Sequence, residues 1–219
     1  MHIIPRINFI CKTGIVQQKN LPDIEKALLE KACIIDIKEA SWSAFPYTPG
    51  VCCRIAFDEN HLYLRYEVRE QAVLAINTKP NDPVCQDSCV EFFFIPPGAD
   101  SYINFESNCI GTVLLGNGKE RSGRIPADPA VIHSILIQST LGTTPFSEKK
   151  GDFSWSLTAV IPISVYMPGQ TNKSGGIYKA NFYKCGDNLT VPHYVSWNRI
   201  NTPEPDFHRP EFFAPLQLA

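Results

Sequence analysis

Two glutamates and an asparagine on neighbouring predicted strands are the residues whose types and spacing could do chemistry. Glu91 lies in Ser88–Ile95, a segment that is largely apolar on both faces, while Glu106 and Asn108 share one face of the next segment, Tyr102–Cys109. A carboxylate on an apolar strand face is costly unless it is hydrogen-bonded or lines a pocket. Glu91 is therefore the most informative acid of the chain.

Two chemistries fit these acids. Carboxylates and amides hydrogen-bond to sugar hydroxyls, while an aromatic face covers the C–H side of a pyranose. A carboxylate pair about 5–10 Å apart, which Glu91 and Glu106 could form, is the requirement of glycoside hydrolysis. Nucleophilic catalysis is not indicated, because there is no G-x-S-x-G motif and none of the eight cysteines lies in a context that identifies a paired base.

One helix and many short strands must position these residues. Asn20 and Pro22 are typical of a helix start, and the helix continues over residues 25–32. After it, segments rich in β-branched and aromatic residues alternate with turn clusters, among which we count Gly116–Gly118 as a hairpin-like turn. The predicted strands are Val51–Phe57, His61–Arg69, Ser88–Ile95, Tyr102–Cys109, Ile132–Gln138, Phe153–Val160, Ile177–Cys185 and Tyr194–Trp197.

This pattern predicts an all-β fold, an antiparallel β-sandwich or jelly-roll-like arrangement with a short N-terminal extension that contains the helix. The 219 residues fit one domain, since sandwiches reach about 200–250 residues as one unit. No repeat or linker divides the chain. We expect residues 1–40 to pack as an extension on a sandwich formed by residues 41–219.

Composition excludes several classes of protein. Hydrophobic residues make up 44% and aromatic residues 11%, which excludes a disordered chain. The 20 basic and 22 acidic residues give a net charge of −2, which argues against a nucleic-acid partner. No apolar run reaches the roughly 18 residues of a membrane span. The scattered cysteines, without a C-x-x-C pair, are expected to be mostly reduced core residues.

The N-terminal residues do not resemble a secretory leader, because Pro5, Arg6, Asn8 and Lys12 interrupt any apolar stretch. We therefore expect a cytoplasmic location for the sequence as written. A periplasmic or extracellular location would follow if a leader had been removed.

The motifs in chain order resemble family 9 of the carbohydrate-binding modules, in its stand-alone bacterial form. The resemblance covers about residues 42–218 and implies a non-catalytic, DOMON-like sandwich for carbohydrate catabolism that binds the end of a glycan or oligosaccharide. The matching segments are Asp87–Phe93, Tyr102–Asn108 with Gly111, Trp155 with Ile161 and Pro162, Ala180–Tyr183, Ser196 with Trp197, and Phe207–Phe213.

The resemblance also implies residue roles. The family's ligand-binding glutamate falls on Glu91 and its asparagine on Asn108, whereas Glu106 stands where the family has an arginine. One tryptophan of the family's aromatic clamp falls near Phe207. The other is expected near Val84, where this chain has none. The predicted ligand-binding residues are Glu91, Asn108, Glu106, Phe207, Tyr183, Trp197 and Arg65, with Tyr47 and Asn181 as further candidates; no residue is predicted to be catalytic.

Calcium is implied by the resemblance alone, since the sequence contains no EF-type loop, and no other cofactor is predicted. His208 is expected to hold the C-terminal loop by a hydrogen bond. Two alternatives stay open: a glycoside-active enzyme using Glu91 and Glu106, and a sandwich that binds a protein or a non-sugar ligand. Haem fits poorly, because Met1 and Met167 are the only methionines. The identity of the sugar and the oligomeric state are not determined by the sequence.

Overall fold

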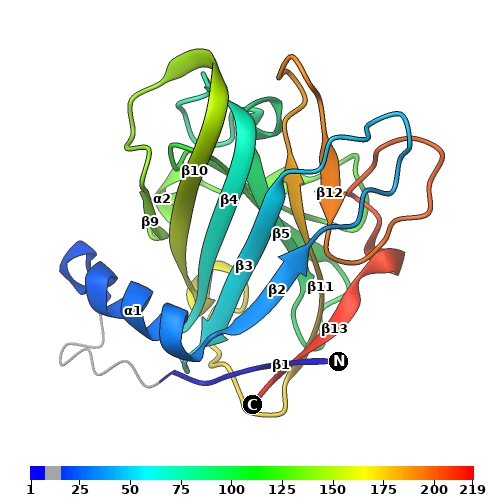
Figure 1. Ribbon diagram of the computed structural model, residues 1–219. Coiled ribbons are helices and arrows are strands. Elements are labelled where there is room, and N and C mark those ends of the chain that lie inside the picture. The colour runs from blue at the N-terminus through cyan, green and yellow to red at the C-terminus, as the bar shows by residue number, and fades with distance from the viewer. Residues whose placement is uncertain (8–15) are drawn as a thin grey trace.

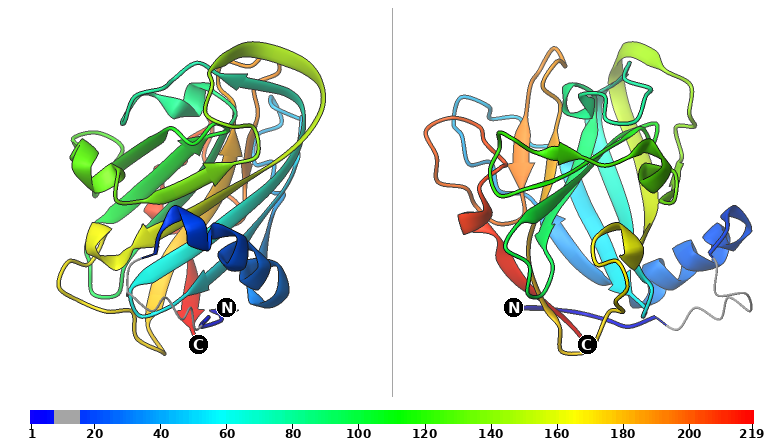
Figure 2. Two further views of the ribbon diagram at one scale, coloured as in Figure 1. Left: turned by 90° about the vertical axis from the view of Figure 1, so that its left-hand side faces the viewer. Right: turned by 180° about the vertical axis from the view of Figure 1, so that it is seen from behind.

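Alternation of apolar and polar residues along the strands gives each sheet one face for the core and one for other contacts. The structure is a computed structural model that describes residues 1–7 and 16–219. Its strands form two sheets that lie face to face as the layers of a sandwich (Figures 1 and 2). The predicted all-β sandwich is confirmed.

The larger layer, sheet A, has eight strands in the described part of the chain. Their order is β1–β13–β11–β5–β6–β7–β8, with β12 also paired to β11. The pairs are antiparallel except for β1 with β13, which is parallel. The strands are β1 (His2–Ile4), β5 (Cys89–Ile95), β6 (Tyr102–Asn108), β7 (Val113–Gly118), β8 (Ile125–Pro126), β11 (Ile177–Cys185), β12 (Tyr194–Ser196) and β13 (Ala214–Leu218).

The smaller layer, sheet B, has five antiparallel strands in the order β2–β3–β4–β10–β9. Two of them, β4 and β10, are 15 and 17 residues long and pair along most of their length. They form the centre of this layer in Figure 1. The strands are β2 (Cys33–Ile37), β3 (Gly50–Phe57), β4 (His61–Ala75), β9 (Leu136–Ser139) and β10 (Phe146–Pro162).

Aromatic rings fill the core between the layers. The ring of Phe92 stacks on those of Phe94 and Phe182, with centroids 4.5 and 4.6 Å apart. These rings belong to one buried cluster with Leu64 and Tyr66 of sheet B. Tyr66 Oη also donates a 2.7 Å hydrogen bond to the backbone oxygen of Glu91, so the layer beneath Glu91 is tied to sheet B.

The predicted N-terminal helix is confirmed as α1 (Leu21–Lys31), which packs on the outer face of sheet B. Its buried residues Ile24 and Leu28 contact a cluster that includes Tyr63 and Val160. None of the helices in the described residues is long and apolar enough to cross a membrane. The remaining helical segments are short: α2 (Pro129–Ile132), η1 (Gln18–Asn20), η2 (Val84–Gln86), η3 (Ile163–Val165) and η4 (Pro210–Phe212).

The N-terminal segment supplies strands to both layers. β1 pairs with the C-terminal strand β13, which places the two chain ends close together in Figure 1, and β2 is the edge strand beside β3. The extension expected over residues 1–40 is thus part of both sheets, and a boundary at residue 40 stays a prediction.

Two local predictions are wrong. Gly116–Gly118 is not a turn but part of β7. A Cβ on Gly116 would lie 2.7 Å from Asn104 Oδ1, so this glycine marks a close approach within the sheet. The predicted strand Ile132–Gln138 is only partly extended. Pro129 and an Asp128 side chain that accepts a bond from Ala130 N start α2, and β9 begins at Leu136.

The cysteines of the described segments are free thiols, and four of them are buried: Cys53, Cys89, Cys109 and Cys185. The others described are half-buried: Cys33, Cys52 and Cys85. Cys11 lies outside the described residues. The buried thiols behave as small apolar residues, in agreement with the expectation from the sequence.

Candidate functional site

A pocket of about 150 Å³ opens on the outer face of sheet A. Its floor comes from β5 and β6, and one wall comes from the loop that carries Phe207, which runs beside β12 in Figure 1. The residues that line it are Cys85, Glu91, Phe93, Glu106, Arg121, Cys185, Asp187, Tyr194 and Pro205–His208. Three predicted site residues, Glu91, Glu106 and Phe207, therefore lie at one pocket.

Glu91 and Glu106 stand side by side because they are direct partners in the pairing of β5 with β6. The side chains of such partners begin only about 4.5–5.5 Å apart. Both residues are buried, with 2% and 5% exposure. Glu91 Oε1 accepts a 3.0 Å hydrogen bond from Cys185 Sγ, and Glu106 Oε1 accepts one of 2.8 Å from Asn104 Nδ2.

Burial raises the pKa of both carboxyl groups, because an ionised carboxylate loses its hydration there. The pKa of Glu91 lies well above its usual value of 4.5, with burial as the main cause and the charge of Glu106 as the next. Burial raises the pKa of Glu106 to about 7, against the lowering effect of the Asn104 hydrogen bond. Burial also raises the pKa of Asp187. A carboxyl group that keeps its proton can donate as well as accept hydrogen bonds.

A chain of side chains orients Glu106. Arg124 donates to Asn104 Oδ1 from Nε and Nη2, at 2.9 and 2.6 Å, and Asn104 in turn donates to Glu106. The guanidinium of Arg124 lies 4.0 Å from the ring centroid of Tyr102, a cation–π contact. The absence of a side chain at Gly116 leaves room for this arrangement.

Phe207 forms the aromatic side of the pocket and rests on Tyr183. The two rings are parallel within 9° with centroids 4.1 Å apart, and Tyr183 Oη donates to the backbone oxygen of Phe207. Phe207 is only 8% exposed, and Tyr183 is fully buried beneath it. Tyr194, which the sequence did not single out, lies edge-on to Phe207 and lines the pocket. Tyr183 therefore supports the aromatic surface, and Phe207 and Tyr194 present it.

Asn108 lies outside the pocket. Its side chain is fully buried, and Nδ2 donates 2.8 Å bonds to the backbone oxygen of Asn77 and to Asp87 Oδ2. Its Oδ1 accepts bonds from the backbone N–H groups of Ile110 and Thr112. With both ends of the amide occupied, Asn108 holds the β6–β7 turn against the loop after β4.

Trp197 and Asn181 are also placed away from the pocket. The half-buried Trp197 packs edge-on against Phe182 in the core between the sheets, with ring centroids 5.7 Å apart. Asn181 is fully buried, and its side chain bonds to the backbone of Phe182 and Asn198. The half-exposed Tyr47 accepts a bond from Gln71 N on the side of β4. The structure does not bring these three residues to Glu91.

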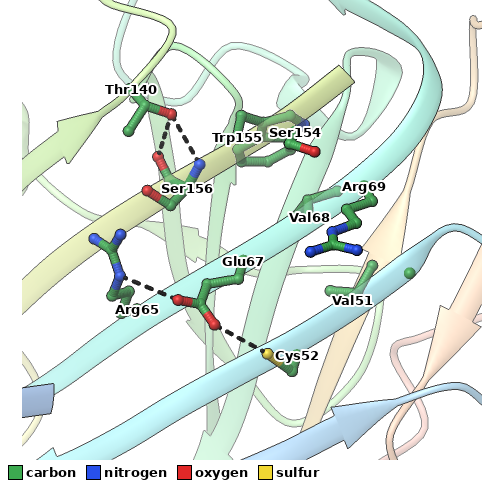
Figure 3. A pocket seen from close by; sticks show the side chains of 11 residues that line it. Val51, Cys52, Arg65, Glu67, Val68, Arg69, Thr140, Ser154, Trp155 and Ser156 are labelled. Carbon is green, nitrogen blue, oxygen red and sulfur yellow. Dashed lines mark hydrogen bonds and ion pairs between the residues drawn. The ribbon is translucent and has the colours of Figure 1, made fainter. Parts of the chain in front are cut away.

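Arg65 lies on the other sheet, at a larger hollow of about 670 Å³ (Figure 3). The hollow runs over the outer face of β3, β4 and β10. Trp155 is its aromatic lining residue, but this side chain is only 3% exposed and its Nε1 donates to Glu70 Oε1. The hollow is larger than the pocket on sheet A but lacks an aromatic face for a sugar ring.

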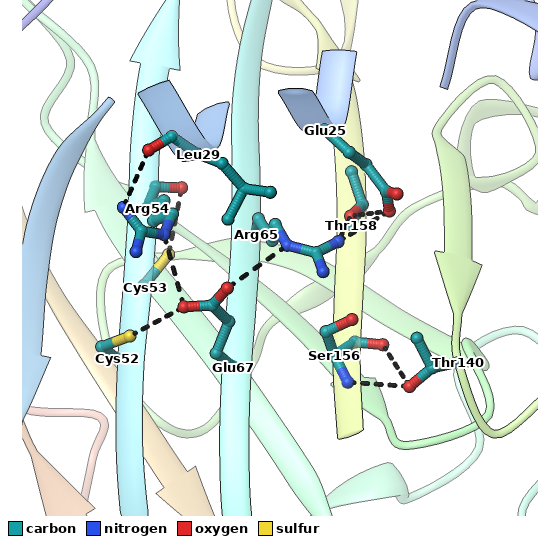
Figure 4. A network of polar contacts seen from close by, with 10 residues as sticks. All are labelled: Glu25, Leu29, Cys52, Cys53, Arg54, Arg65, Glu67, Thr140, Ser156 and Thr158. Atoms are coloured by element: carbon teal, nitrogen blue, oxygen red, sulfur yellow. Dashed lines mark hydrogen bonds and ion pairs between the residues drawn. The ribbon is translucent and has the colours of Figure 1, made fainter. Parts of the chain in front are cut away.

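Several charged side chains beside this hollow pair with one another (Figure 4). Arg65 Nη1 donates to Glu25 Oε1 of α1 at 2.7 Å, and its Nε lies 3.6 Å from Glu67 Oε1. Glu67 Oε2 accepts bonds from Arg54 Nε and Cys52 Sγ. This network attaches α1 to sheet B, so we assign Arg65 a structural contact rather than a place at the pocket on sheet A.

Comparison with known proteins identifies the family. The model of carbohydrate-binding family 9 matches residues 23–218. The chain belongs to carbohydrate-binding family 9. A crystal structure of a proposed carbohydrate-binding protein from Bacteroides uniformis is similar, with 34% identity, a TM-score of 0.89, and coverage of 100% of this chain and 99% of that one. A search of curated proteins found no match.

Two further structures share the fold of this family 9 chain. They contain a family 9 module from Caldicellulosiruptor kristjanssonii, in complex with cellotriose or with glucose. The identities are 12% and 10%, and the TM-scores are 0.58 and 0.56. The alignments cover 99% of this chain in both cases and 92% and 94% of the other chains. The resemblance deduced from the motifs is confirmed.

Several pocket residues of this family 9 chain were missed by sequence reasoning. Asp206 directly precedes Phe207, the first residue of a segment that carried the family resemblance, so its position was a usable signal. His208 was predicted only to hold the loop, and its Nδ1 lies 2.8 Å from Tyr102 Oη. Cys85 of η2 and Asp187 carried no local signal, because they are far apart in the chain and meet only in the folded structure, where Asp187 N donates a hydrogen bond to Cys85 O.

Calcium does not fit the metal-capable group of this pocket. Ca²⁺ takes six to eight oxygen ligands. The close group of potential ligands in the described residues consists of Cys89, Glu91 and Cys185, which offers two sulfur atoms. A calcium ion elsewhere in the protein stays a prediction from the resemblance.

Glu106 makes stability depend on pH. Its pKa rises from 4.5 to about 7 on folding, so its favourable contribution is fully present below about pH 4.5 and is lost as the pH rises through about 7. We expect Glu106→Gln to flatten the fall of the unfolding free energy over this range and to be more stable than the parent at about pH 8. Urea denaturation at a series of pH values, with a chelator present, measures this. The exposed Glu204→Gln is the control, and its unfolding free energy should change with pH as that of the parent does. If the unfolding free energies of the parent and Glu106→Gln ran parallel over the pH range, Glu106 would not be the source of the pH dependence.

Proposed function

We propose that this protein binds the end of a carbohydrate chain, without catalysis, in the pocket on the outer face of sheet A. One observation carries the proposal. Glu91, Glu106 and Phe207, which come from three separate segments and were predicted as ligand contacts, line the same pocket. The glucose and cellotriose complexes of the Caldicellulosiruptor kristjanssonii module support a carbohydrate as the ligand class.

The pocket has the chemistry that a sugar ring requires. Glu106 can accept or donate a hydrogen bond near neutral pH, since its pKa is about 7. Arg121 and His208 add polar groups at the same pocket, and Phe207 and Tyr194 add aromatic surface. Sugar hydroxyls form hydrogen bonds with such polar groups, and the apolar C–H face of the sugar ring packs on such an aromatic surface.

The size of the pocket favours a chain end over a chain interior. Its volume of about 150 Å³ is below the roughly 300–1,000 Å³ of sites that enclose drug-sized ligands. A more open hollow of about 720 Å³ adjoins it and shares Arg121, Asp206 and His208. We infer that one terminal sugar enters the pocket while the following units lie in the open hollow.

Glu106→Ala tests the site. We expect it to weaken binding of the ligand by about 10- to 100-fold, because it removes a buried hydrogen-bonding partner worth roughly 1–3 kcal/mol. Isothermal titration calorimetry with glucose and cellotriose measures this. Arg69→Ala, at the exposed edge of the hollow on sheet B, is the matched control and should bind like the parent. If Arg69→Ala alone lost affinity for these sugars, the binding site would lie on sheet B instead.

A second candidate function is glycoside hydrolysis, which the direct pairing of Glu91 with Glu106 and the pKa of about 7 for Glu106 favour. We expect no turnover, because Glu91 Oε1 accepts a hydrogen bond from Cys185 Sγ and is thereby occupied within the protein. Long incubation with end-labelled oligosaccharides, followed by chromatography, should return the substrate unchanged. Product formed by the parent but not by Glu106→Gln would establish catalysis.

A further inference from the structure

Two cysteine thiols and a glutamate carboxylate meet beside the pocket, and two of these three residues, Cys185 and Glu91, line it. Cys89 and Cys185 are direct partners in the antiparallel pairing of β5 with β11, and Glu91 follows Cys89 by two residues on the same face of β5. One potential ligand atom of each residue lies within 4.8 Å of the other two. Cys185 Sγ is 3.0 Å from Glu91 Oε1.

We propose that Cys89, Cys185 and Glu91 bind a zinc ion whose fourth coordination position faces the pocket. Zn²⁺ is held tetrahedrally by thiolate sulfur at about 2.3 Å and carboxylate oxygen at about 2.0–2.2 Å, which places the ligand atoms about 3.5–3.8 Å from one another. The three atoms lie within 4.8 Å of one another, with Cys185 Sγ 3.0 Å from Glu91 Oε1, so side-chain rotations alone have to adjust these separations to the tetrahedron. Two sulfur ligands select a softer ion than calcium or magnesium, which bind through oxygen.

The surroundings of the three residues suit a cation. Cys185 and Glu91 line the pocket, so an ion has a path from solvent, and Cys85 and Asp187 flank the same opening. The three proposed ligands are 0–2% exposed. A divalent cation would offset the charge of these groups once deprotonated, so its binding should release protons.

The zinc site shares Glu91 with the proposed sugar pocket but not the other two sugar contacts. Glu106 lies on β6 and Phe207 on a loop, whereas Cys89 and Cys185 lie on β5 and β11. A metal titration therefore needs no sugar, and a sugar titration can be run with a chelator present. The zinc proposal is therefore tested independently of the carbohydrate proposal.

The test uses the full, untagged chain, reduced and stripped with a chelator. We expect one equivalent of CoCl₂ to produce a thiolate-to-cobalt charge-transfer absorption, which ZnCl₂ then removes. Cys185→Ser should lower the affinity for zinc by at least about 100-fold. Even the mutation of residues that only hydrogen-bond to the metal ligands typically lowers metal affinity by about 10- to 100-fold. Cys52→Ser is the matched control. Its thiol also contacts a glutamate, Glu67 Oε2 at 3.5 Å, but on sheet B, and it should bind like the parent.

Glu91→Gln is a second variant of nearly unchanged shape, for the case in which Cys185→Ser does not fold; circular dichroism checks both. No charge-transfer absorption in the parent, or the same absorption and affinity in Glu91→Gln, would overturn the proposal. A parent that binds glucose but no cobalt contradicts the zinc site alone. A parent that binds cobalt but no sugar contradicts the carbohydrate proposal alone.

Discussion

Lys184→Met is expected to lower the free energy of unfolding by about 3–5 kcal/mol. Lys184 is fully buried on the inner face of β11, and its Nζ lies 2.8 Å from Glu70 Oε2 of β4 in the other sheet. Nζ also donates to the backbone oxygen of Cys185 and contacts His193 Nε2 at 2.8 Å. Methionine fills the space but leaves the carboxylate of Glu70 buried without its cation.

His193 Nε2 lies 3.8 Å from Glu70 Oε2 but is a poor replacement for the lost charge. Burial is the main reason that the pKa of His193 falls to about 3, with Lys184 as the next, and the burial remains in the variant. Urea denaturation followed by tryptophan fluorescence measures the free energy of unfolding of both proteins. An equal slope of this free energy against urea concentration in both shows that two-state unfolding is kept. The control is the double variant Lys184→Met with Glu70→Gln. It contains no unpaired charge, and the glutamine can still accept the bond from Trp155 Nε1. It should recover most of the loss; a single variant within about 1 kcal/mol of the parent would contradict the prediction.

Asp87→Ala is expected to cost about 3–5 kcal/mol, because it leaves several buried donors without an acceptor. The fully buried carboxylate accepts bonds from Ile76 N, Asn77 N and Asn108 Nδ2, at 3.1, 3.0 and 2.8 Å. It thereby joins the loop after β4 to the end of β6. Thermal and urea unfolding measure the loss.

Asp82→Ala is the matched control for Asp87→Ala. Asp82 also accepts two backbone bonds, from Thr78 N and Lys79 N, but in an exposed loop. Water can replace these bonds, so we expect a loss of about 1 kcal/mol or less. Equal losses in the two variants would show that burial of the Asp87 acceptor contributes little.

Strand positions follow closely from the sequence, because alternation along a strand is a local property. In β4, Leu62, Leu64, Tyr66 and Val68 enter the core as the period-two pattern of His61–Arg69 predicts. The pattern fails where a strand is irregular. β10 extends from Phe146 to Pro162, well beyond the predicted 153–160, and its pairing with β4 shifts register between Phe146 and Phe153.

The acidic floor of the site was also accessible from the sequence. Glu91 stands out because its strand is otherwise apolar, and its pairing with Glu106 follows from two consecutive strands joined by a short connection. Asn108 shows the limit of this reasoning. It shares the face of Glu106 on β6, but the loop after β4 covers it and takes up its amide. Alternation predicts a face; it does not predict what covers that face.

The sequence by itself determined the all-β class, the helix at the N-terminus, membership of carbohydrate-binding family 9, and the two glutamates of the pocket floor. Only the tertiary structure decided that Lys184 pairs with Glu70, that Cys89, Cys185 and Glu91 form one group, and that Phe207 rests on Tyr183. The physical reason is the range of the contacts. β5 pairs with β11 across more than 80 positions of the chain, and no local pattern carries the register of such a pair.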